Sequence, residues 1–243
     1  LQVYAGLEIV TDQPPRTIQQ DIPHRLYGFL EPTQVYSVGG WLSQVVQEIE
    51  TSFGQGLVPI VVGGTGLYLK ALLEGISSIP SIDPQVRQDL QGRKSSQEAL
   101  YLELKAVDRD LAAHIHAHDS QRTLRGLEVY YGTGKPLSYW QTQKPTPLPY
   151  VFETLFLMPS KEDLQVKIRD RIDAMLSKGV LEEVAAVLAL SPSPTAMKAI
   201  GLREFGAYLE GKRSLIEAKD LMFVHTCQYA KRQRTWFRHQ FKV

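Results

Sequence analysis

The residues best placed to do chemistry form a glycine turn, Gly63, Gly64, Thr65 and Gly66, between an apolar run and a helix-like segment. The apolar run, residues 58–62, has the length and β-branched content of a buried parallel strand. Glycines at such a turn let a ligand approach the backbone, and the first N–H groups of the new helix can bind an anion. Thr65 adds a hydroxyl. A plain tight turn is the competing interpretation, because the motif is short and no GK[ST] follows it.

Two further groups of residues are suited to phosphate groups or bases. Arg122 and Arg125 lie three apart on one face of an expected helix, although a solvated helix end explains them as well. The segment KRQRTWFR, residues 231–238, interleaves cations with aromatic rings, which suits phosphate neutralisation and base stacking. An amphipathic helix with a basic face would have the same residue pattern. No acidic residue follows Asp220, which favours nucleic acid.

Several other chemistries are disfavoured. The single cysteine, Cys227, excludes a disulfide scaffold and a cysteine-cluster zinc site, and fits a reducing compartment. The His, Asp and Glu residues have neither zincin nor EF-hand spacing, so we expect no metal site formed by protein ligands alone. No GxSxG motif is present. The apolar runs are too short for a membrane span and no secretory signal opens the chain, so we expect a cytoplasmic protein.

The elements that must position these residues indicate an α/β protein. The chain has 243 residues, 43% of them hydrophobic and 22% charged, with a net charge of +1, as in an ordinary globular protein. Strands are expected at residues 26–30, 58–62 and 152–157, and helices alternate with the first two. This order predicts a parallel sheet with crossover helices.

The middle of the chain interrupts that order with an all-helical insertion. We predict an α/β core formed by residues 1–82 and 151–243, and a helical domain at 83–150. Proline-rich linkers at 77–84 and 143–149 flank the insertion. Its periodicity predicts helices at 86–91, 96–107, 110–116 and 122–131. In the core, helices are expected at 38–53, 161–179, 181–190 and 214–237, and residues 195–210 contain the motif segment 198–203.

Taken together, seven blocks make the chain resemble the bacterial tRNA isopentenyltransferase family, also called tRNA dimethylallyltransferases. They occur in family order over nearly the whole chain, and this order is far more specific than any one motif. The blocks read LQVYAGLEIVTDQP, PHRLYGFLEPTQVYS, VGGTGLYLKALLEG, DPQVR, QRTLRGLEVYYGTGKPLS, MKAIGLREFGAYLEG and AKRQRTWFRHQ.

The resemblance implies a P-loop-NTPase-like α/β core with an inserted helical domain. It implies transfer of the dimethylallyl group of dimethylallyl diphosphate to N6 of the adenosine 3′-adjacent to the tRNA anticodon. Mg²⁺ assists the diphosphate, and the target base is flipped into a channel before it reacts. The partners would be tRNA and dimethylallyl diphosphate, and a monomer is expected.

The resemblance also carries over site residues by motif. Thr65 matches a threonine near the reacting adenosine, Gly63, Gly64 and Gly66 form the substrate turn around it, and Arg171 matches an arginine that contacts the diphosphate. Lys198 and Leu202 replace a more common arginine and tyrosine, so the contacts there are less secure. The matching tRNA-contacting positions are Arg87, Gln121, Arg122, Thr123, Leu124, Arg125, Lys198, Ala199, Ile200, Gly201, Leu202, Arg203, Lys231, Arg232, Gln233, Arg234, Thr235, Trp236, Phe237 and Arg238.

Two features of the family have no counterpart in these 243 residues. They are the first strand with its P-loop, and an Asp-Ser pair that supplies the proposed general base. We therefore expect these 243 residues by themselves to be inactive and the intact protein to be active. A sheet without its first strand would also have an exposed edge. Two alternatives follow: a tRNA-binding relative that has lost catalysis, and a small-molecule phosphotransferase. The helical insertion and the basic C-terminal segment argue against the second.

Overall fold

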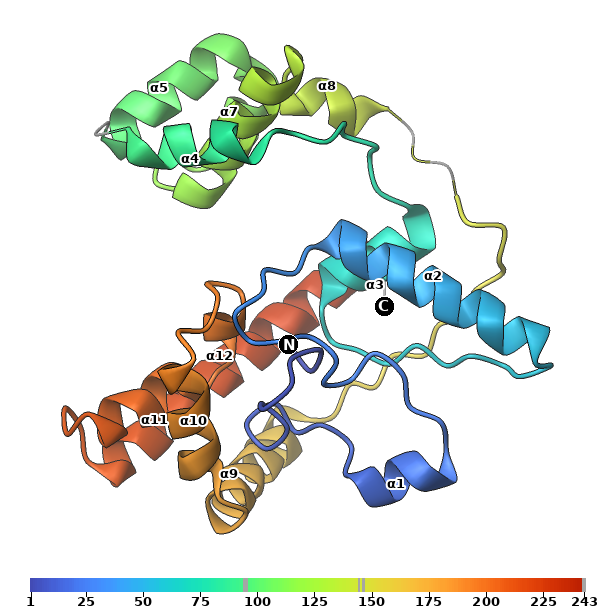
Figure 1. The fold of residues 1–243 in the computed structure, drawn as a ribbon, viewed down its shortest axis with the longest axis vertical. Helices are drawn as coiled ribbons and strands as arrows, with labels where there is room; N and C mark the ends of the chain where they lie inside the picture. Colours follow the sequence, from blue (N-terminus) through green and yellow to red (C-terminus); the bar gives the residue numbers. More distant parts are fainter. Residues whose placement is uncertain (94–95, 144, 146, 242–243) are drawn as a thin grey trace. The chain divides into compact units, whose positions relative to one another are not determined.

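The structure is a computed structural model that describes residues 1–241 except 94, 95, 144 and 146 (Figure 1). Lys242 of the basic segment and part of the predicted linker 143–149 therefore lie outside the described residues. The chain divides into two compact units, Leu1–Lys70 with Val151–Val243, and Ala71–Tyr150. Residues 71–82, which we predicted to belong to the core, fall within the second unit.

Helices account for most of the described secondary structure. The first unit contains α1 (Arg16–Asp21), α2 (Val38–Gly54), α9 (Lys161–Ser177), α10 (Val180–Ala189), a 3-10 turn η1 (Ala196–Lys198), α11 (Leu202–Leu209) and α12 (Leu215–Phe241). The second unit contains α4 (Pro84–Gly92), α5 (Gln97–Val107), α6 (Arg109–His114), α7 (Ser120–Thr133) and α8 (Leu137–Thr142). Helix α3 (Gly66–Glu74) begins in the first unit and ends in the second.

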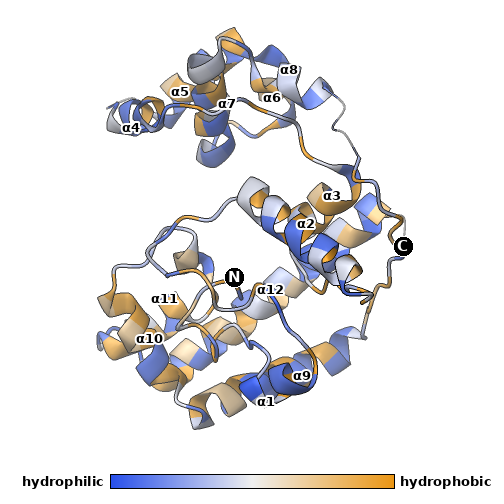
Figure 2. Ribbon diagram, turned by 45° about the vertical axis from the view of Figure 1, so that its right-hand side comes forward, coloured by the Kyte–Doolittle hydropathy of each residue, from blue (hydrophilic) through white to orange (hydrophobic). Residues whose placement is uncertain are grey.

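The core of the first unit lies between the N-terminal loop and helices α9 to α12. Ile168, Ile172 and Met175 recur at helical spacing on α9 and are buried together with Tyr4 of the loop and Phe205 of α11. Figure 2 shows that hydrophobic residues run along α10 and α11. Because these helices bury apolar stripes against one another, they provide a firm support for α12, which packs on α9 and α11.

The core of the second unit depends on close helix packing and one buried carboxylate. Leu104 of α5 and Leu127 of α7 are fully buried in its centre. Asp108 is buried and accepts the N–H of Leu111 at 3.0 Å and of Ser138 at 2.9 Å. The same carboxylate therefore caps the start of α6 and fixes the start of α8.

The predicted parallel sheet is not confirmed. Within the described residues, the β interaction is an isolated parallel bridge between Tyr4 and Leu30, in place of the strand expected at 26–30. Residues 58–62 and 152–157 are not in a strand, and Val58, Ile60 and Val62 are 85%, 83% and 76% exposed. Their apolar content is typical of strands, but a strand is stable only where a neighbouring backbone completes its hydrogen bonds.

The helix predictions agree with the structure to within a few residues. Between residues 195 and 210, Gly201 adopts φ +116°, outside the helical region. Residues 196–198 form only the short turn η1, and α11 starts after Gly201. Helices α1 and α8 were not predicted, since both are only six residues long and their periodicity is weak.

Substitution of Gly126 tests the close packing of the second unit. A Cβ at this position of α7 would lie 2.6 Å from Leu104 Cδ1 and 2.7 Å from Leu111 Cδ2, both in the core. We expect Gly126→Val to lower the free energy of unfolding by about 2 kcal/mol through overpacking. Urea unfolding followed by circular dichroism measures it.

The matched control is Gly92→Val at the end of α4, where no described atom lies within 4 Å of the added Cβ. Its effect should stay within about 0.5 kcal/mol. Equal effects of the two substitutions would show that the packing around α7 is looser than the structure indicates.

Candidate functional site

The glycine turn is packed directly against α12. The side chain of Gln233 donates a hydrogen bond from Nε2 to the carbonyl oxygen of Gly64 at 2.8 Å. A Cβ added to Gly66 would lie 2.2 Å from Cε3 of Trp236. The structure thus brings together two segments that the sequence analysis singled out separately, the substrate turn and the basic C-terminal segment.

Thr65 lies between these two contacts and is exposed. Its carbonyl oxygen accepts the N–H groups of Tyr68 at 3.0 Å and Leu69 at 3.2 Å, which starts α3. The backbone of Thr65 is therefore fixed by the helix that follows, while its side chain lies at the surface. This is the placement that a hydroxyl needs to reach a bound substrate.

Helix α12 also fixes the segment that returns from the second unit. The ring of Phe156 lies 5.7 Å from that of Phe237 and 5.2 Å from that of Phe241. The guanidinium of Arg234 donates to the carbonyl oxygen of Pro159 at 2.5 Å. The C-terminal half of α12 is consequently the element to which both the glycine turn and residues 156–159 are attached.

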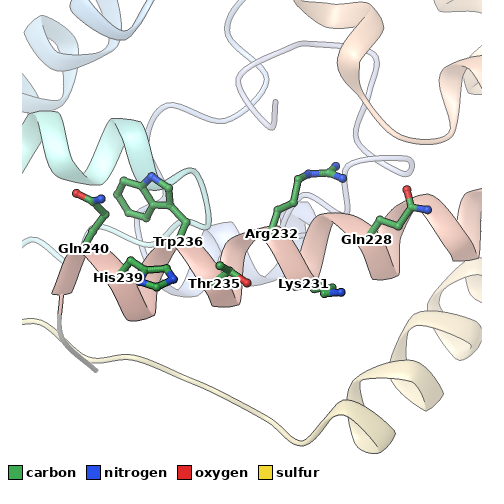
Figure 3. Close-up of a pocket in the computed structure, with 7 residues that line it drawn as sticks. All are labelled: Gln228, Lys231, Arg232, Thr235, Trp236, His239 and Gln240. Carbon is green, nitrogen blue, oxygen red and sulfur yellow. The ribbon is translucent and has the colours of Figure 1, made fainter. Parts of the chain in front are cut away.

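A groove of about 600 Å³ runs along the surface of α12 (Figure 3). Its lining residues come in two rows spaced four apart, which point to different sides of the helix axis in Figure 3. The rows are Gln228, Arg232, Trp236 and Gln240, and Lys231, Thr235 and His239. Two cations, an indole ring and several hydrogen-bonding groups suit a phosphate backbone with a stacked base.

The eight residues predicted on α12 thus have different environments. Lys231, Arg232, Thr235 and Trp236 line the groove, and Arg238 is exposed. Gln233, Arg234 and Phe237 instead contact other segments of this chain, as described above. Sequence reasoning missed the lining residues Gln228, His239 and Gln240, which the four-residue spacing from Arg232, Thr235 and Trp236 could have identified.

Arg171 lies on α9 with incomplete pairing. Its Nη1 is 3.9 Å from Oδ2 of Asp12, which is an ion pair too long for a hydrogen bond. Its Nε is buried and has no hydrogen-bond partner among the described residues. A buried donor without a partner is costly, so this guanidinium is suited to an anion with several oxygen atoms.

The loop that faces Arg171 is held by a carboxylate of α10. Glu183 accepts the N–H groups of Ile9 and Val10, each at 2.7 Å. Burial raises the pKa of Glu183, and these two hydrogen bonds counteract part of the rise. Asp12 lies just beyond, with φ +55°, and its carbonyl oxygen accepts from Gln2 Nε2 at 2.9 Å. The position of Asp12 beside Arg171 is therefore set by the backbone of the loop.

The segment predicted at residues 198–203 exposes only some of its side chains. Lys198 and Arg203 are exposed and Ile200 is half-buried, whereas Ala199, Gly201 and Leu202 are buried. The exposed cations are available to RNA phosphates, and the buried residues support them.

A buried carboxylate holds this segment in place. Glu204 accepts the N–H of Gly201 at 2.7 Å, and its other oxygen lies 2.5 Å from Nδ1 of His225 on α12. The start of α11 is thereby tied to α12 as well as capped.

In the second unit, the predicted RNA-contacting residues again separate by burial. Arg87 on α4 and Gln121, Arg122 and Arg125 on α7 are exposed, and α4 packs against α7. Thr123 is fully buried and hydrogen-bonds with Gln97, and Leu124 packs against the core.

Two of these arginines have acidic neighbours, one at the N-cap of α7 and one within the helix. Arg122 pairs with Asp119, whose pKa is lowered chiefly by the hydrogen bond from the Arg122 backbone N–H, and Arg125 pairs with Glu128 at 3.1 Å. These exposed pairs orient the guanidinium groups at little energetic gain.

Two further findings bound the chemistry. Among the described residues, no group of three His, Cys, Asp or Glu side chains could hold a metal ion. In the helices that the structure describes, none is long and apolar enough to cross a membrane.

Comparison with known proteins gives one consistent result. A family model described as "IPP transferase" matches residues 2–240. The chain is 50% identical to a protein of Bartonella henselae named tRNA dimethylallyltransferase, over 99% of this chain and 84% of that protein.

Two solved structures are similar as well. One is a tRNA delta(2)-isopentenylpyrophosphate transferase from Staphylococcus epidermidis, with 30% identity, a TM-score of 0.62, and coverage of 98% of this chain and 78% of that one. The other is a eukaryotic dimethylallyltransferase acting on tRNA, with 28% identity, a TM-score of 0.83, and coverage of 97% and 61%.

The loop contact of Glu183 predicts a pH dependence of stability. Because the folded pKa is raised above the ordinary value of 4.5, the folded protein keeps this proton to higher pH than the unfolded chain does. The resulting stabilisation is fully present below 4.5 and is lost as the pH rises through the raised pKa. We expect the free energy of unfolding of wild type, minus that of Glu183→Gln, to fall over this range.

Urea unfolding at a series of pH values measures this difference. Glu182→Gln, at an exposed neighbour on the same helix, is the control for a change from glutamate to glutamine. A constant difference for Glu183→Gln would contradict the assigned role of burial.

Proposed function

Because the chain belongs to the IPP transferase family, we propose that it transfers the dimethylallyl group of dimethylallyl diphosphate to a tRNA. The acceptor in this proposal is N6 of the adenosine 3′-adjacent to the anticodon. The observation that carries it is the contact between the glycine turn and α12, which places the substrate turn beside a groove with two cations and an indole ring. Since its relatives are named as enzymes, an inactive RNA-binding relative has no support over the enzyme.

The reaction breaks the bond between the allylic carbon and the diphosphate oxygen, forms a bond from that carbon to N6, and releases a proton from the amine. Negative charge develops on the leaving diphosphate, so its stabilisation is the main electrostatic demand. Arg171 meets this demand in our proposal, because its buried Nε is a donor that lacks a partner. Thr65, exposed at the tip of the turn, hydrogen-bonds the acceptor adenosine.

Mg²⁺ is part of the proposal through the diphosphate. This ion usually takes most of its ligands from phosphate oxygens and water, with one or two carboxylates. The described residues contain no cluster that could hold a metal by itself. We therefore assign no reaction step of this chain to a protein-held ion.

The proposed tRNA surface consists of the exposed cations and the groove of α12. A base stacked on Trp236 and phosphates near Lys231 and Arg232 account for the chemistry of the groove. Lys198, Arg203 and Arg238 extend the surface on the first unit. On the second unit, we propose contacts from Arg87, Gln121, Arg122 and Arg125.

Three further proposals follow from family membership. We propose a P-loop-like sheet core in which residues 58–62 and 152–157 are strands, which the apolar content of these short segments supports. We also propose that the protein acts as a monomer. The cytoplasm is the proposed compartment, because the substrate is tRNA.

The first experiment is a prenyl-transfer assay. The protein is incubated with Mg²⁺, dimethylallyl diphosphate and an unmodified tRNA, and the digested tRNA is analysed by mass spectrometry. We expect dimethylallyl-adenosine at the position 3′ to the anticodon. Binding of tRNA without any transfer, with a family enzyme active under the same conditions, would favour the inactive relative.

Salt dependence tests the groove of α12. Lys231→Ala and Arg232→Ala should each weaken tRNA binding and reduce the slope of log K against log salt concentration by about one, because each removes one phosphate contact. Filter binding at several salt concentrations measures the slope. Lys212→Ala, an exposed lysine paired with Glu210 at 2.5 Å, is the control and should leave it unchanged. If Lys231→Ala and Arg232→Ala gave the same slope as the control Lys212→Ala, the result would argue against RNA in the groove.

Substitution of Arg171 tests the diphosphate contact. Arg171→Gln should raise the KM for dimethylallyl diphosphate by about tenfold to a hundredfold, because a charge-assisted hydrogen bond is worth roughly 1.5–3 kcal/mol. The KM for tRNA should stay close to that of wild type. Lys178→Gln, at the end of the same helix, is the control. A raised KM for tRNA alone would reassign Arg171 to RNA binding.

A further inference from the structure

We infer that Gln233 and Trp236 are positioning residues that hold the glycine turn in place for catalysis. This inference rests on the proposed function, because it takes the turn to be the substrate turn of a prenyl transfer. It assigns Gln233 a different role from the tRNA contact that family resemblance implies. The side chain that would reach RNA is instead bound to the backbone of this chain.

Helix α12 lies so close to the turn that a Cβ added at position 64 or 66 would overlap with a side chain of the helix. Nε2 of Gln233 lies 2.8 Å from the carbonyl oxygen of Gly64, and a Cβ added to Gly64 would lie 2.1 Å from the same nitrogen. A Cβ added to Gly66 would meet three indole atoms of Trp236 at 2.2, 2.3 and 2.6 Å. A Cβ at position 66 would therefore overlap with the rigid indole, and a Cβ at position 64 would displace the flexible amide of Gln233.

The remaining residues of the turn are differently placed. No described atom lies within 4 Å of a Cβ built at Gly63, and Thr65 is exposed. The two contacts with α12 flank Thr65 in the sequence, one through Gly64 and one through Gly66. Together they fix the backbone on both sides of the hydroxyl that is proposed to reach the adenosine.

Trp236 connects this arrangement to the groove. Its indole both packs against Gly66 and lines the groove along α12 (Figure 3). A base that stacks in the groove would therefore contact a side chain that already supports the turn. Docking of RNA and placement of Thr65 are then coupled through one aromatic ring.

The test separates positioning from RNA binding by comparing two glutamines of α12. Gln233→Ala removes the hydrogen bond to Gly64, and we expect the single-turnover rate constant of prenyl transfer to fall by about tenfold to a hundredfold. The Kd for tRNA should change by less than about twofold. Gln228→Ala removes an amide that lines the groove, and should raise the Kd for tRNA severalfold.

A substitution on the other side of the contact provides a second test. Gly64→Ala places its Cβ where the Gln233 amide lies, so it should reduce the rate constant to a similar extent. The double substitution should be no slower than Gln233→Ala alone, because the hydrogen bond is lost only once. Additive losses would overturn the inference.

Hydrogen exchange gives a readout that does not depend on activity. The amides of Tyr68 and Leu69, which bond to the Thr65 carbonyl, should exchange faster in Gln233→Ala than in wild type and Gln228→Ala. Unchanged exchange, or a raised Kd for tRNA with an unchanged rate constant, would overturn the inference. If the wild type transfers no dimethylallyl group, the proposed function fails, and the exchange result still decides whether Gln233 holds the turn.

Discussion

The candidate site depends on the close packing of the glycine turn against α12. That packing requires α12 itself to be fixed, and the structure fixes it by several contacts along its first half. The guanidinium of Arg169 lies 3.9 Å from the ring centre of Phe223, and Lys219 pairs with Asp173 at 2.6 Å. His225 contacts the buried carboxylate of Glu204. The second half of α12, which contacts the turn, thus continues from a first half that is fixed by these contacts. The position of the turn is fixed in the same way, because it packs against this helix.

The arginines of the chain differ in what their guanidinium groups are paired with. Arg122 and Arg125 are paired with acids at the start of α7 and within it, while Arg234 donates to a backbone carbonyl. Arg171 has a loose ion pair and a buried donor without a partner among the described residues. A net charge of +1 therefore conceals a local excess of positive charge where an anionic substrate would bind.

The sequence allowed the helices to be predicted because their apolar spacing is a local property. It did not show that Gln233 bonds to Gly64, since that contact joins residues 169 positions apart. Family motifs named Ala199 and Leu202 as RNA contacts, but both are buried, because a motif does not reveal which side faces the core. Short apolar runs predicted strands at 58–62 and 152–157, but such a run does not specify whether a neighbouring backbone pairs with it.

The long separation between the turn and α12 has a consequence for how the protein is made. During synthesis, residues 63–66 leave the ribosome well before residues 233–236. The turn therefore cannot pack against α12 until the end of the chain has been made. Contacts between distant positions also form slowly, because the intervening chain must first be ordered. The helical unit at 71–150 has its own core and can form earlier. A nascent chain would therefore hold a folded helical unit while the glycine turn was not yet packed against α12.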